Sequence, residues 1–451
     1  MTPTKLTALA APKGLSAAAP GRPAPTWTAR RPAAAGGWRF SAFGRPRGTD
    51  MHASLNPPWT GRTAFALCAS ALVALALAAC GGGVGTGGTG GNATAYASGP
   101  ITGFGSVIVG GVRFDDSAAA VEDGDGARRS RDELRLGMTV EVDSSAITSD
   151  SSGSRASASR IRFESELSGL VGAVDVAGAS FMLLGQRVTV DDTTVFDDRL
   201  GSGLAGLATG QAVEVYAVFD AAVQRYRAAR IEAAALSLGL RLRGQLTAVD
   251  AAAQTLRIGT TSYSYVGASG VPAGLAVGQF VRLRLELDLL PTPRWVVRSF
   301  GTALQTLPDA DELKAEGLIS AFISPASFSL NGRVVDAGGA AFPDGTAGLG
   351  TGVRVEVEGA VRAGVLRATK VSIKSDEEVR ERGFEITGAI AAVNATARTF
   401  TVRGVTVNTT RGDLRFDNGS AADLAVGRNV EVRGVLGADR RTVEATRIRF
   451  L

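Results

Sequence analysis

The chain has 451 residues, enough for several domains and more than one buried core, which excludes a single small scaffold. Hydrophobic residues make up 45% of it, and 16 prolines are too few for a proline-rich disordered chain, so most of it is expected to fold. The net charge of +5 would suit a nucleic-acid-binding protein. However, nine of the 48 Lys and Arg residues and only one of the 43 Asp and Glu residues lie in residues 1–79. The remainder therefore has a small net negative charge.

An uncharged apolar stretch runs from Ala64 to Ala79 and ends in Leu-Ala-Ala-Cys at Cys80. It is shorter than the roughly 18 residues that span a bilayer and matches the hydrophobic region of a secretory signal. Its last four residues resemble the lipobox of bacterial lipoproteins. This resemblance implies cleavage before Cys80 and a diacylglycerol on the Cys80 thiol. A short transmembrane anchor, or a cleaved signal followed by an accidental cysteine, are the alternatives.

A Pro-, Ala- and Arg-rich stretch precedes this signal. Met51 stands at an ordinary distance from the cleavage site, so residues 51–79 are interpreted as the lipoprotein signal peptide. Residues 1–50 are interpreted as read-through from a misplaced start or as a disordered extension. Gly81 resembles the residue found after the cysteine in lipoproteins sorted to the outer membrane. The prediction is an exported protein, anchored to the outer membrane through lipid at Cys80 and facing the periplasm or the exterior.

Histidine and cysteine are nearly absent. His52 is the only histidine, and Cys68 and Cys80 are the only cysteines. Cleavage before Cys80 removes His52 and Cys68 and leaves one acylated cysteine. The mature chain would then lack the residues for His- or Cys-dependent catalysis, for His/Cys zinc sites and for disulfides. No catalytic residue, metal site or cofactor is predicted.

Three landmarks recur in fixed order after a Gly- and Thr-rich segment, residues 80–98, which is predicted to be a flexible tether. They are a glycine that opens an alternating run, the element Leu-x-x-Gly-x-x-Val-x-Val, and a closing motif typified by Ala-x-Arg-Ile. The opening glycines are Gly99, Gly169, Gly244, Gly317 and Gly388. This recurrence predicts five copies of one unit. The copies span residues 99–164, 165–235, 236–303, 317–375 and 376–451, with a linker at 304–316.

Apolar residues alternate with period two within each copy, and helical signals are few, so the copies are predicted to be β. Five short strands in about 70 residues suit a small Greek-key barrel of the oligonucleotide/oligosaccharide-binding (OB) type. The predicted fold is all-β, a tandem array of about five small OB-like barrels after a cleaved signal. Propeller blades and solenoid repeats are the alternative, but their periods are nearer 20 to 50 residues. Such small units are expected to pack against their neighbours.

These landmarks resemble the bacterial family DUF5666, a domain of unknown function that occurs in tandem in exported lipoproteins and is thought to be OB-like. The resemblance covers roughly residues 98–451 and implies no catalytic or binding residues. The third copy departs from the pattern. It has Arg282 where the other copies have Glu, and Ser299 where they have Ile or Val. This departure bears on its packing and not on its membership.

Paired loop acids are candidate calcium ligands, because calcium takes six to eight oxygens. They are Asp115 and Asp116, Glu122 to Asp125, Asp191 and Asp192, and Asp197 and Asp198. They lack the spacing of an EF-hand loop and do not recur in copies three and four, so solvated loop acids are the favoured interpretation. A glycosidase needs two carboxyls held about 5 to 10 Å apart. Nothing in the sequence selects two among so many acids.

Nucleic-acid binding by OB barrels uses aromatic platforms and a basic groove. Only Trp295 and five tyrosines follow residue 80, and the net charge there is negative, so no nucleic-acid partner is predicted. Tyr263 and Tyr265 could stack on a sugar, although burial on a strand is favoured. The predicted function is a non-enzymatic exported lipoprotein whose repeats provide a binding or spacing surface in the cell envelope, for an envelope protein or polysaccharide. The alternative is an exported carboxylate-dependent hydrolase, or a calcium- or polysaccharide-binding protein.

The residue between the two valines of each Leu-x-x-Gly-x-x-Val-x-Val element is expected on the outer face, together with the basic residue of the closing motif. The predicted cross-strand pairs are Glu214 with Arg230, Glu356 with Lys370 and Glu431 with Arg447, each worth about 0.2 to 1 kcal/mol. In copy three the same pairing would place Arg282 against Arg298. An acid such as Glu286 is therefore expected near Arg298.

Overall fold

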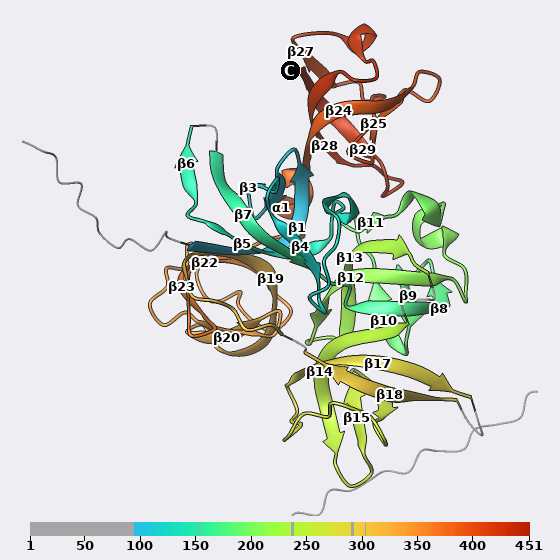
Figure 1. Cartoon of the computed structure of the whole chain (residues 1–451), viewed down its shortest axis with the longest axis vertical. Helices are drawn as coiled ribbons and strands as arrows, with labels where there is room; N and C mark the ends of the chain where they lie inside the picture. The colour runs from blue at the N-terminus through green and yellow to red at the C-terminus, as the bar shows by residue number, and fades with distance from the viewer. Residues whose placement is uncertain (1–93, 152, 236–238, 290–292, 303) are drawn as a thin grey trace, which may run out of the picture. The chain divides into compact units, whose positions relative to one another are not determined.

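A computed structural model of the chain describes residues 94–151, 153–235, 239–289, 293–302 and 304–451. Regular structure in these segments is almost entirely β-strand (Figure 1). The interpretations of residues 1–93, including the signal peptide and the lipid on Cys80, lie outside the described residues. Within the described segments, no helix has the length and apolar character needed to cross a membrane.

The strands form five groups, named barrels 1 to 5. Barrel 1 contains β1 (Thr94–Phe104), β2 (Val107–Val109), β3 (Val112–Asp115), β4 (Ala120–Asp123), β5 (Thr139–Ser145), β6 (Thr148–Asp150) and β7 (Gly153–Phe163). Barrel 2 contains β8 (Leu167–Asp175), β9 (Ser180–Leu183), β10 (Gln186–Thr189), β11 (Val195–Phe196), β12 (Ala212–Asp220) and β13 (Arg225–Ala233). Barrel 3 contains β14 (Leu240–Asp250), β15 (Thr255–Ile258), β16 (Thr261–Ser264), β17 (Phe280–Asp288) and β18 (Arg294–Gly301).

The last two barrels are separated by a short helix. Barrel 4 contains β19 (Ala310–Ser324), β20 (Ser327–Leu330), β21 (Arg333–Asp336), β22 (Arg354–Arg362) and β23 (Val365–Ile373). Helix α1 (Asp376–Arg382) follows. Barrel 5 contains β24 (Phe384–Asn394), β25 (Thr399–Val402), β26 (Val405–Asn408), β27 (Arg415–Asp417), β28 (Asn429–Leu436) and β29 (Val443–Phe450). Short 3₁₀ turns lie at Arg131–Glu133, Asp198–Leu200, Gly203–Gly206 and Ala421–Asp423.

The strands of every barrel pair in one closed circuit. In barrel 4, β19 pairs antiparallel with β20 and β20 with β21, β21 runs parallel to β23, and β22 closes the circuit by pairing antiparallel with both β23 and β19. The same order recurs in barrels 1, 2, 3 and 5. Each strand of the circuit therefore has a partner on both sides. The prediction of all-β, OB-like barrels is confirmed.

The opening glycines lie within the first strands, opposite the first valine of the Leu-x-x-Gly-x-x-Val-x-Val element. The pairs are Gly99–Val140, Gly169–Val213, Gly244–Val281, Gly317–Val355 and Gly388–Val430. At Gly169, Gly244 and Gly317 the first strand passes close to other side chains. A Cβ on Gly317 would lie 2.2 Å from the amide nitrogen of Asn331. A larger residue at position 317 would displace the Asn331 side chain, whose Oδ1 accepts from the Leu318 N–H at 3.1 Å.

The glycine of the Leu-x-x-Gly-x-x-Val-x-Val element is a turn residue with left-handed backbone. Its φ lies between 80° and 87° in all five copies, a region that glycine enters without steric cost. Its N–H donates to a carbonyl of the first strand, as in the 2.8 Å bond from Gly352 to Ile319, and the same bond recurs in each barrel. This local chemistry explains why one sequence element builds the same barrel five times.

For the three predicted cross-strand pairs, the predicted strand face of each residue is correct, but the predicted partner of each glutamate is wrong. Buried valines flank each middle glutamate, which is partly exposed. Glu214 lies opposite Glu232 and not Arg230, Glu356 opposite Ser372 and not Lys370, and Glu431 opposite Arg449 and not Arg447. Each prediction misses by two residues, a shift that keeps both side chains on the same face of the strand.

A β-bulge and the turn of the hairpin together set this register. The bulge recurs at one place in the hairpin formed by the fourth and fifth strands of each circuit, after Asp143, Tyr216, Arg284, Glu358 and Arg433. The extra residue displaces the pairing beyond it. The prediction for the third copy is confirmed, because Arg298 forms an ion pair with Glu286.

Two predicted connecting segments contain strand. Strand β1 begins at Thr94, within the predicted tether, and Ala95 and Ala97 are buried. Strand β19 begins at Ala310, within the predicted linker at 304–316. The starts of both strands are extended for the same reason. β1 and β19 pair with each other in parallel, from Ala95 with Glu312 to Ser98 with Ala315.

Strand pairing also joins other barrels. The end of β1 pairs in parallel with β24 of barrel 5, at Gly103 with Glu385 and Phe104 with Ile386. Strand β8 of barrel 2 pairs with β14 of barrel 3. The apolar cores follow the same grouping, since one core cluster spans barrels 2 and 3 and another spans barrels 1 and 5. The barrels are therefore joined by backbone hydrogen bonds as well as by the linking chain.

Candidate functional site

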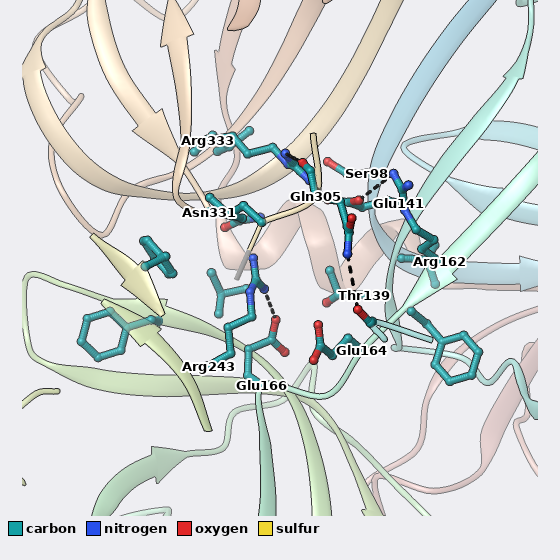
Figure 2. Close-up of a pocket in the computed structure, with 18 of the residues that line it drawn as sticks. Ser98, Thr139, Glu141, Arg162, Glu164, Glu166, Arg243, Gln305, Asn331 and Arg333 are labelled. Carbon is teal, nitrogen blue, oxygen red and sulfur yellow. Dashed lines mark hydrogen bonds and ion pairs between the residues drawn. The ribbon is translucent and has the colours of Figure 1, made fainter. Parts of the chain in front are cut away.

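A cavity of about 100 Å³ is bordered by barrels 1, 2, 3 and 4 (Figure 2). Barrel 1 contributes β1, β5 and β7, and barrel 3 contributes β14 and β17. The connector between barrels 1 and 2, residues 164–166, adds two glutamates. The polar side chains on its wall are Ser98, Thr139, Glu141, Arg162, Glu164, Glu166, Arg243, Gln305, Asn331 and Arg333.

Glu141 joins barrel 1 to barrel 4. It is the middle residue of the first Val-x-Val element. Its Oε1 accepts from Nε of Arg333 at 3.1 Å and from Nη2 of the same side chain, and its Oε2 accepts from Nη2 of Arg162 at 3.1 Å. Burial would raise the pKa of Glu141, but the charges of the two arginines and the Arg333 hydrogen bonds hold it below its usual value. Glu141 is therefore an ionised carboxylate with two cationic partners.

Glu166 joins the connector to barrels 2 and 3. Its Oε1 accepts from Nη1 of Arg243 at 3.0 Å, and its Oε2 accepts from the backbone N–H of Ala217 at 2.9 Å. Burial raises the pKa of Glu166 to about 7, because one guanidinium and one amide do not fully offset the loss of water. Glu166 therefore titrates near neutral pH.

Glu164 occupies the other end of the connector. It forms an ion pair with Nε of Arg282, whose Nη1 also donates to the Gly124 carbonyl and to Asp125, each at 2.9 Å. Burial raises the pKa of Glu164 above its usual value, against the opposing charge of Arg282. Arg282 is the residue that departs from the repeat pattern. Its reversed charge is explained by docking barrel 3 onto acids of barrel 1 and the connector.

Tyr96 of β1 places a phenol on the cavity wall. The residue is 1% exposed, and its hydroxyl makes no hydrogen bond of normal geometry, although Ser98, Glu141 and Arg333 lie nearby. Burial raises the pKa of Tyr96, so the hydroxyl stays protonated. It can donate a hydrogen bond to a bound molecule.

A second cavity of about 70 Å³ is lined by barrels 1, 2, 4 and 5 and by α1. The side chain of Glu316 on β19 is 1% exposed, accepts from Nη1 of Arg382 at 2.6 Å and lies 3.6 Å from Nη1 of Arg354. Arg227 of β13 donates to Asp376 of α1 at 2.8 Å. These ion pairs join barrels 2 and 4 to α1 beside the second cavity.

The predicted cross-strand residues have other partners. Glu214 pairs with Arg241 of barrel 3, Glu356 with Lys374 and Lys314, Glu431 with Arg449 and Arg433, Arg230 with Glu232, Lys370 with Glu358, and Arg447 with Asp417. The structure does not bring these six residues together in one site. Only Glu214 forms an ion pair with another barrel.

Several of the paired loop acids lie in turns or between barrels. Asp123 accepts from the backbone N–H groups of Asp125 and Ala127, and Asp192 pairs with Arg440 of barrel 5. Describing all of them as solvated is wrong for Asp197, which is 9% exposed. Among the described residues, no group of three or more His, Cys, Asp or Glu side chains could hold a metal ion.

The two tyrosines of barrel 3 are buried. Tyr263 is fully buried and donates to the Leu184 carbonyl at 2.8 Å, and Tyr265 packs edge-on against Phe300. Neither presents an open ring face, so the sugar-stacking alternative is wrong for this pair.

Most of the cavity residues were not identified from the sequence. No repeated motif contains Arg243, Arg333 or Glu166. Their interaction partners also lie far away in the chain. Glu141 and Arg333, for example, are separated by 192 positions. The one available signal was Arg282, whose charge opposes that of its counterparts in the other copies.

Comparison with known families identifies three segments of the chain. Residues 168–232, 316–372 and 387–449 match "Domain of unknown function (DUF5666)". They fall in barrels 2, 4 and 5, so the tandem DUF5666 resemblance is confirmed for these three barrels. No curated protein matches the chain.

Two solved structures show weak similarity. Drosophila Unr CSD456 is 14% identical, with 47% of this chain and 97% of that chain covered and a TM-score of 0.14. A multidomain protein with nucleic acid binding domains from Streptococcus pneumoniae is also 14% identical, with 51% and 76% covered and the same TM-score. Scores this low support no inference about this chain.

Proposed function

We propose that this chain, which carries tandem DUF5666 domains, is a non-enzymatic exported lipoprotein that provides a binding or spacing surface in the cell envelope. The observation that carries the proposal is the joining of β1 to both β19 and β24. These pairings connect barrels that are far apart in the sequence. A chain of independent modules would not need them, whereas one extended surface built from several barrels does.

The carboxylates of the cavity support a non-enzymatic role. Glu141 and Glu166 each accept hydrogen bonds on both oxygens, and Glu164 pairs with Arg282. A glycosidase needs two carboxyls flanking a sugar ring. Each of these three carboxylates is engaged by an arginine instead.

The membrane attachment is proposed from the sequence. Thr94, where β1 begins, follows Cys80 by only 14 residues. Lipid at Cys80 would therefore hold barrels 1 and 4 near the outer membrane, where an envelope protein or a polysaccharide is the proposed partner.

Two measurements test the proposal. Mass spectrometry of the protein isolated from its host should find an acylated Cys80 at the amino terminus, and Cys80→Ser should move the protein from the membrane fraction to the soluble fraction. An unmodified Cys80 within a longer chain would refute the anchoring.

Affinity capture from solubilised envelope should recover a partner with the wild-type protein. Turnover of an oligosaccharide by the purified protein, lost in Glu166→Gln and retained in Glu286→Gln, would refute the non-enzymatic role.

A further inference from the structure

The Leu-x-x-Gly turn of barrel 1 is a contact point between barrels. Its Leu136 is 4% exposed, and the Leu136 carbonyl accepts from Nη1 of Arg230 in barrel 2 at 3.1 Å. A Cβ on Gly137 would lie 3.0 Å from the carbonyl oxygen of Ala229 and 3.1 Å from Cγ2 of Val195, both in barrel 2. The turn therefore docks on β11 and β13, with an apolar residue at its tip.

Barrel 4 uses the same turn to contact a neighbour. A Cβ on Gly352 would lie 2.8 Å from Oδ1 of Asp220 and 3.3 Å from Cβ of Ala222, where β12 ends in barrel 2. This is a different part of barrel 2 from the one that receives the barrel 1 turn. Docking through the turn is therefore a property of the repeated element and not of one barrel.

The turns of barrels 3 and 5 have the same sequence and are exposed. Both read Leu-Ala-Val-Gly, at residues 275–278 and 424–427. The position of Leu136 is occupied by Val277 in barrel 3, which is 66% exposed, and by Val426 in barrel 5, which is 67% exposed. The residue type that is buried between barrels 1 and 2 therefore faces solvent in these two copies.

No other part of the described chain covers these two turns. Apart from chain neighbours, none of the described atoms lies within 4 Å of a Cβ built on Gly278 or Gly427. The turn of barrel 2 is also open, but it has the polar Thr209 at its tip. An open turn of this type accepts a polar residue, so the two valines are not required by the turn itself.

Barrel 3 presents a wider apolar surface around its turn. The loop between β16 and β17, residues 265–279, contains no charged residue, whereas the counterpart segments of the other four barrels all contain charged residues. Val266 and Val271 in this loop are 59% and 41% exposed. Because no charge would have to be desolvated, this surface is suited to a contact that excludes water.

We propose that the Leu-Ala-Val-Gly turns of barrels 3 and 5 dock on a second copy of this chain, each packing on the fifth strand of a barrel in that copy. The occupant is argued from the contact within this chain, where the barrel 1 turn packs on β13 and Arg230 donates to the turn. The counterparts of Arg230 in barrels 3 and 5 are Arg298 and Arg447, whose side chains are 61% and 50% exposed. Each has an ion pair within its own barrel, as Arg230 has with Glu232. A second copy therefore offers the receiving surface of a contact that the chain already makes.

Sedimentation velocity of the full-length protein in a density-matched detergent tests this self-association. We expect a dimer or larger species whose fraction rises with protein concentration. The double variant Val277→Asp with Val426→Asp should weaken association about 100-fold, because burial of each valine contributes roughly tenfold. The control Val176→Asp changes a valine of barrel 2 that is 57% exposed and lies outside the turn, and it should associate like the wild type. Unchanged thermal unfolding of both variants would show that folding is unaffected.

Photo-crosslinking identifies what covers the turns. A p-benzoylphenylalanine in place of Val277 or Val426 should give a covalent dimer of this chain, with the second peptide drawn from β18 or β29. The same group in place of Val176 should give no dimer. A monomer at every concentration, a crosslink only to lipid or to a different protein, or equal weakening by Val176→Asp would overturn the proposal.

Discussion

Two walls of the same cavity carry buried glutamates that behave in opposite ways. On the wall between barrels 1 and 4, Glu141 has two arginine partners and a lowered pKa. On the wall between the connector and barrel 3, Glu166 has one arginine and one amide, and its pKa rises to about 7. The Glu141 side chain is 25% exposed and that of Glu166 is 11% exposed, so the milder loss of water and the second arginine both favour the charged form of Glu141.

The comparison teaches how the barrels are held together. The Glu141 pair is a fixed ionic contact, whereas the Glu166 pair is ionic only above neutral pH. Breaking a buried pair by removing one partner is more costly than removing both, because the remaining charge is left without compensation. The predictions that follow separate the two walls on this basis.

The largest effect is expected from Arg333→Met on the Glu141 wall. Glu141 would keep only Arg162 as a cationic partner while remaining buried, which should lower the free energy of unfolding by about 3 to 5 kcal/mol. Denaturant-induced unfolding at pH 7.5 measures this loss. The matched control is Arg367→Met in the same barrel, whose pair with Asp336 is exposed and should change stability little. Equal losses in the two variants would contradict a special role for the buried pair.

A smaller effect, with a distinctive pH dependence, is expected on the Glu166 wall. The folded pKa of about 7 lies above the usual value of 4.5, so the folded state holds this proton more tightly than the unfolded state. Stability from this group is therefore present below pH 4.5 and declines as pH rises to 7, by roughly 3 kcal/mol in all.

The variant Glu166→Gln should remove this decline, so that it gains stability relative to the wild type as pH rises from 5 to 8. Unfolding curves at several pH values measure the difference. Glu141→Gln should do the opposite. Its lowered pKa means that the wild-type contribution is present above pH 4.5 and is lost as pH falls through the folded pKa. Parallel pH profiles for the two variants would contradict the contrast between the walls.

The smallest loss of stability is expected in barrel 5, at the residue between the two valines of its Leu-x-x-Gly-x-x-Val-x-Val element. Glu431 is the counterpart of Glu141, but its partners Arg449 and Arg433 belong to its own barrel and are about half exposed, whereas the two arginine partners of Glu141 are each 11% exposed. Glu431→Gln should cost at most about 1 kcal/mol. Thermal unfolding of Glu431→Gln beside Glu141→Gln compares identical substitutions at equivalent positions. A similar loss in both would mean that contact between barrels adds nothing to this position.

Sequence patterns were sufficient for the barrel and insufficient for the cavity. The alternation of Val430, Glu431 and Val432 correctly placed the glutamate on the outer face. It could not give the partner, because a shift of two residues preserves every face. The bulge after Arg433 and the turn of the hairpin set that register. The departure at Arg282 was visible in the sequence, but its targets in barrel 1 were not.

The sequence by itself determined the repeated unit and its internal construction. Apolar alternation defines the buried face of each strand, and glycines such as Gly352 meet a backbone requirement within their own turn, so both act over a few residues. The tertiary structure alone decided which barrels meet, through β1 with β19 and β24, and which charges face the cavity. Those contacts join residues far apart in the chain, such as Gly103 with Glu385 on β1 and β24, and Glu141 with Arg333, which are 192 positions apart. Their energies depend on burial and on the count of opposite charges nearby, which no local pattern encodes.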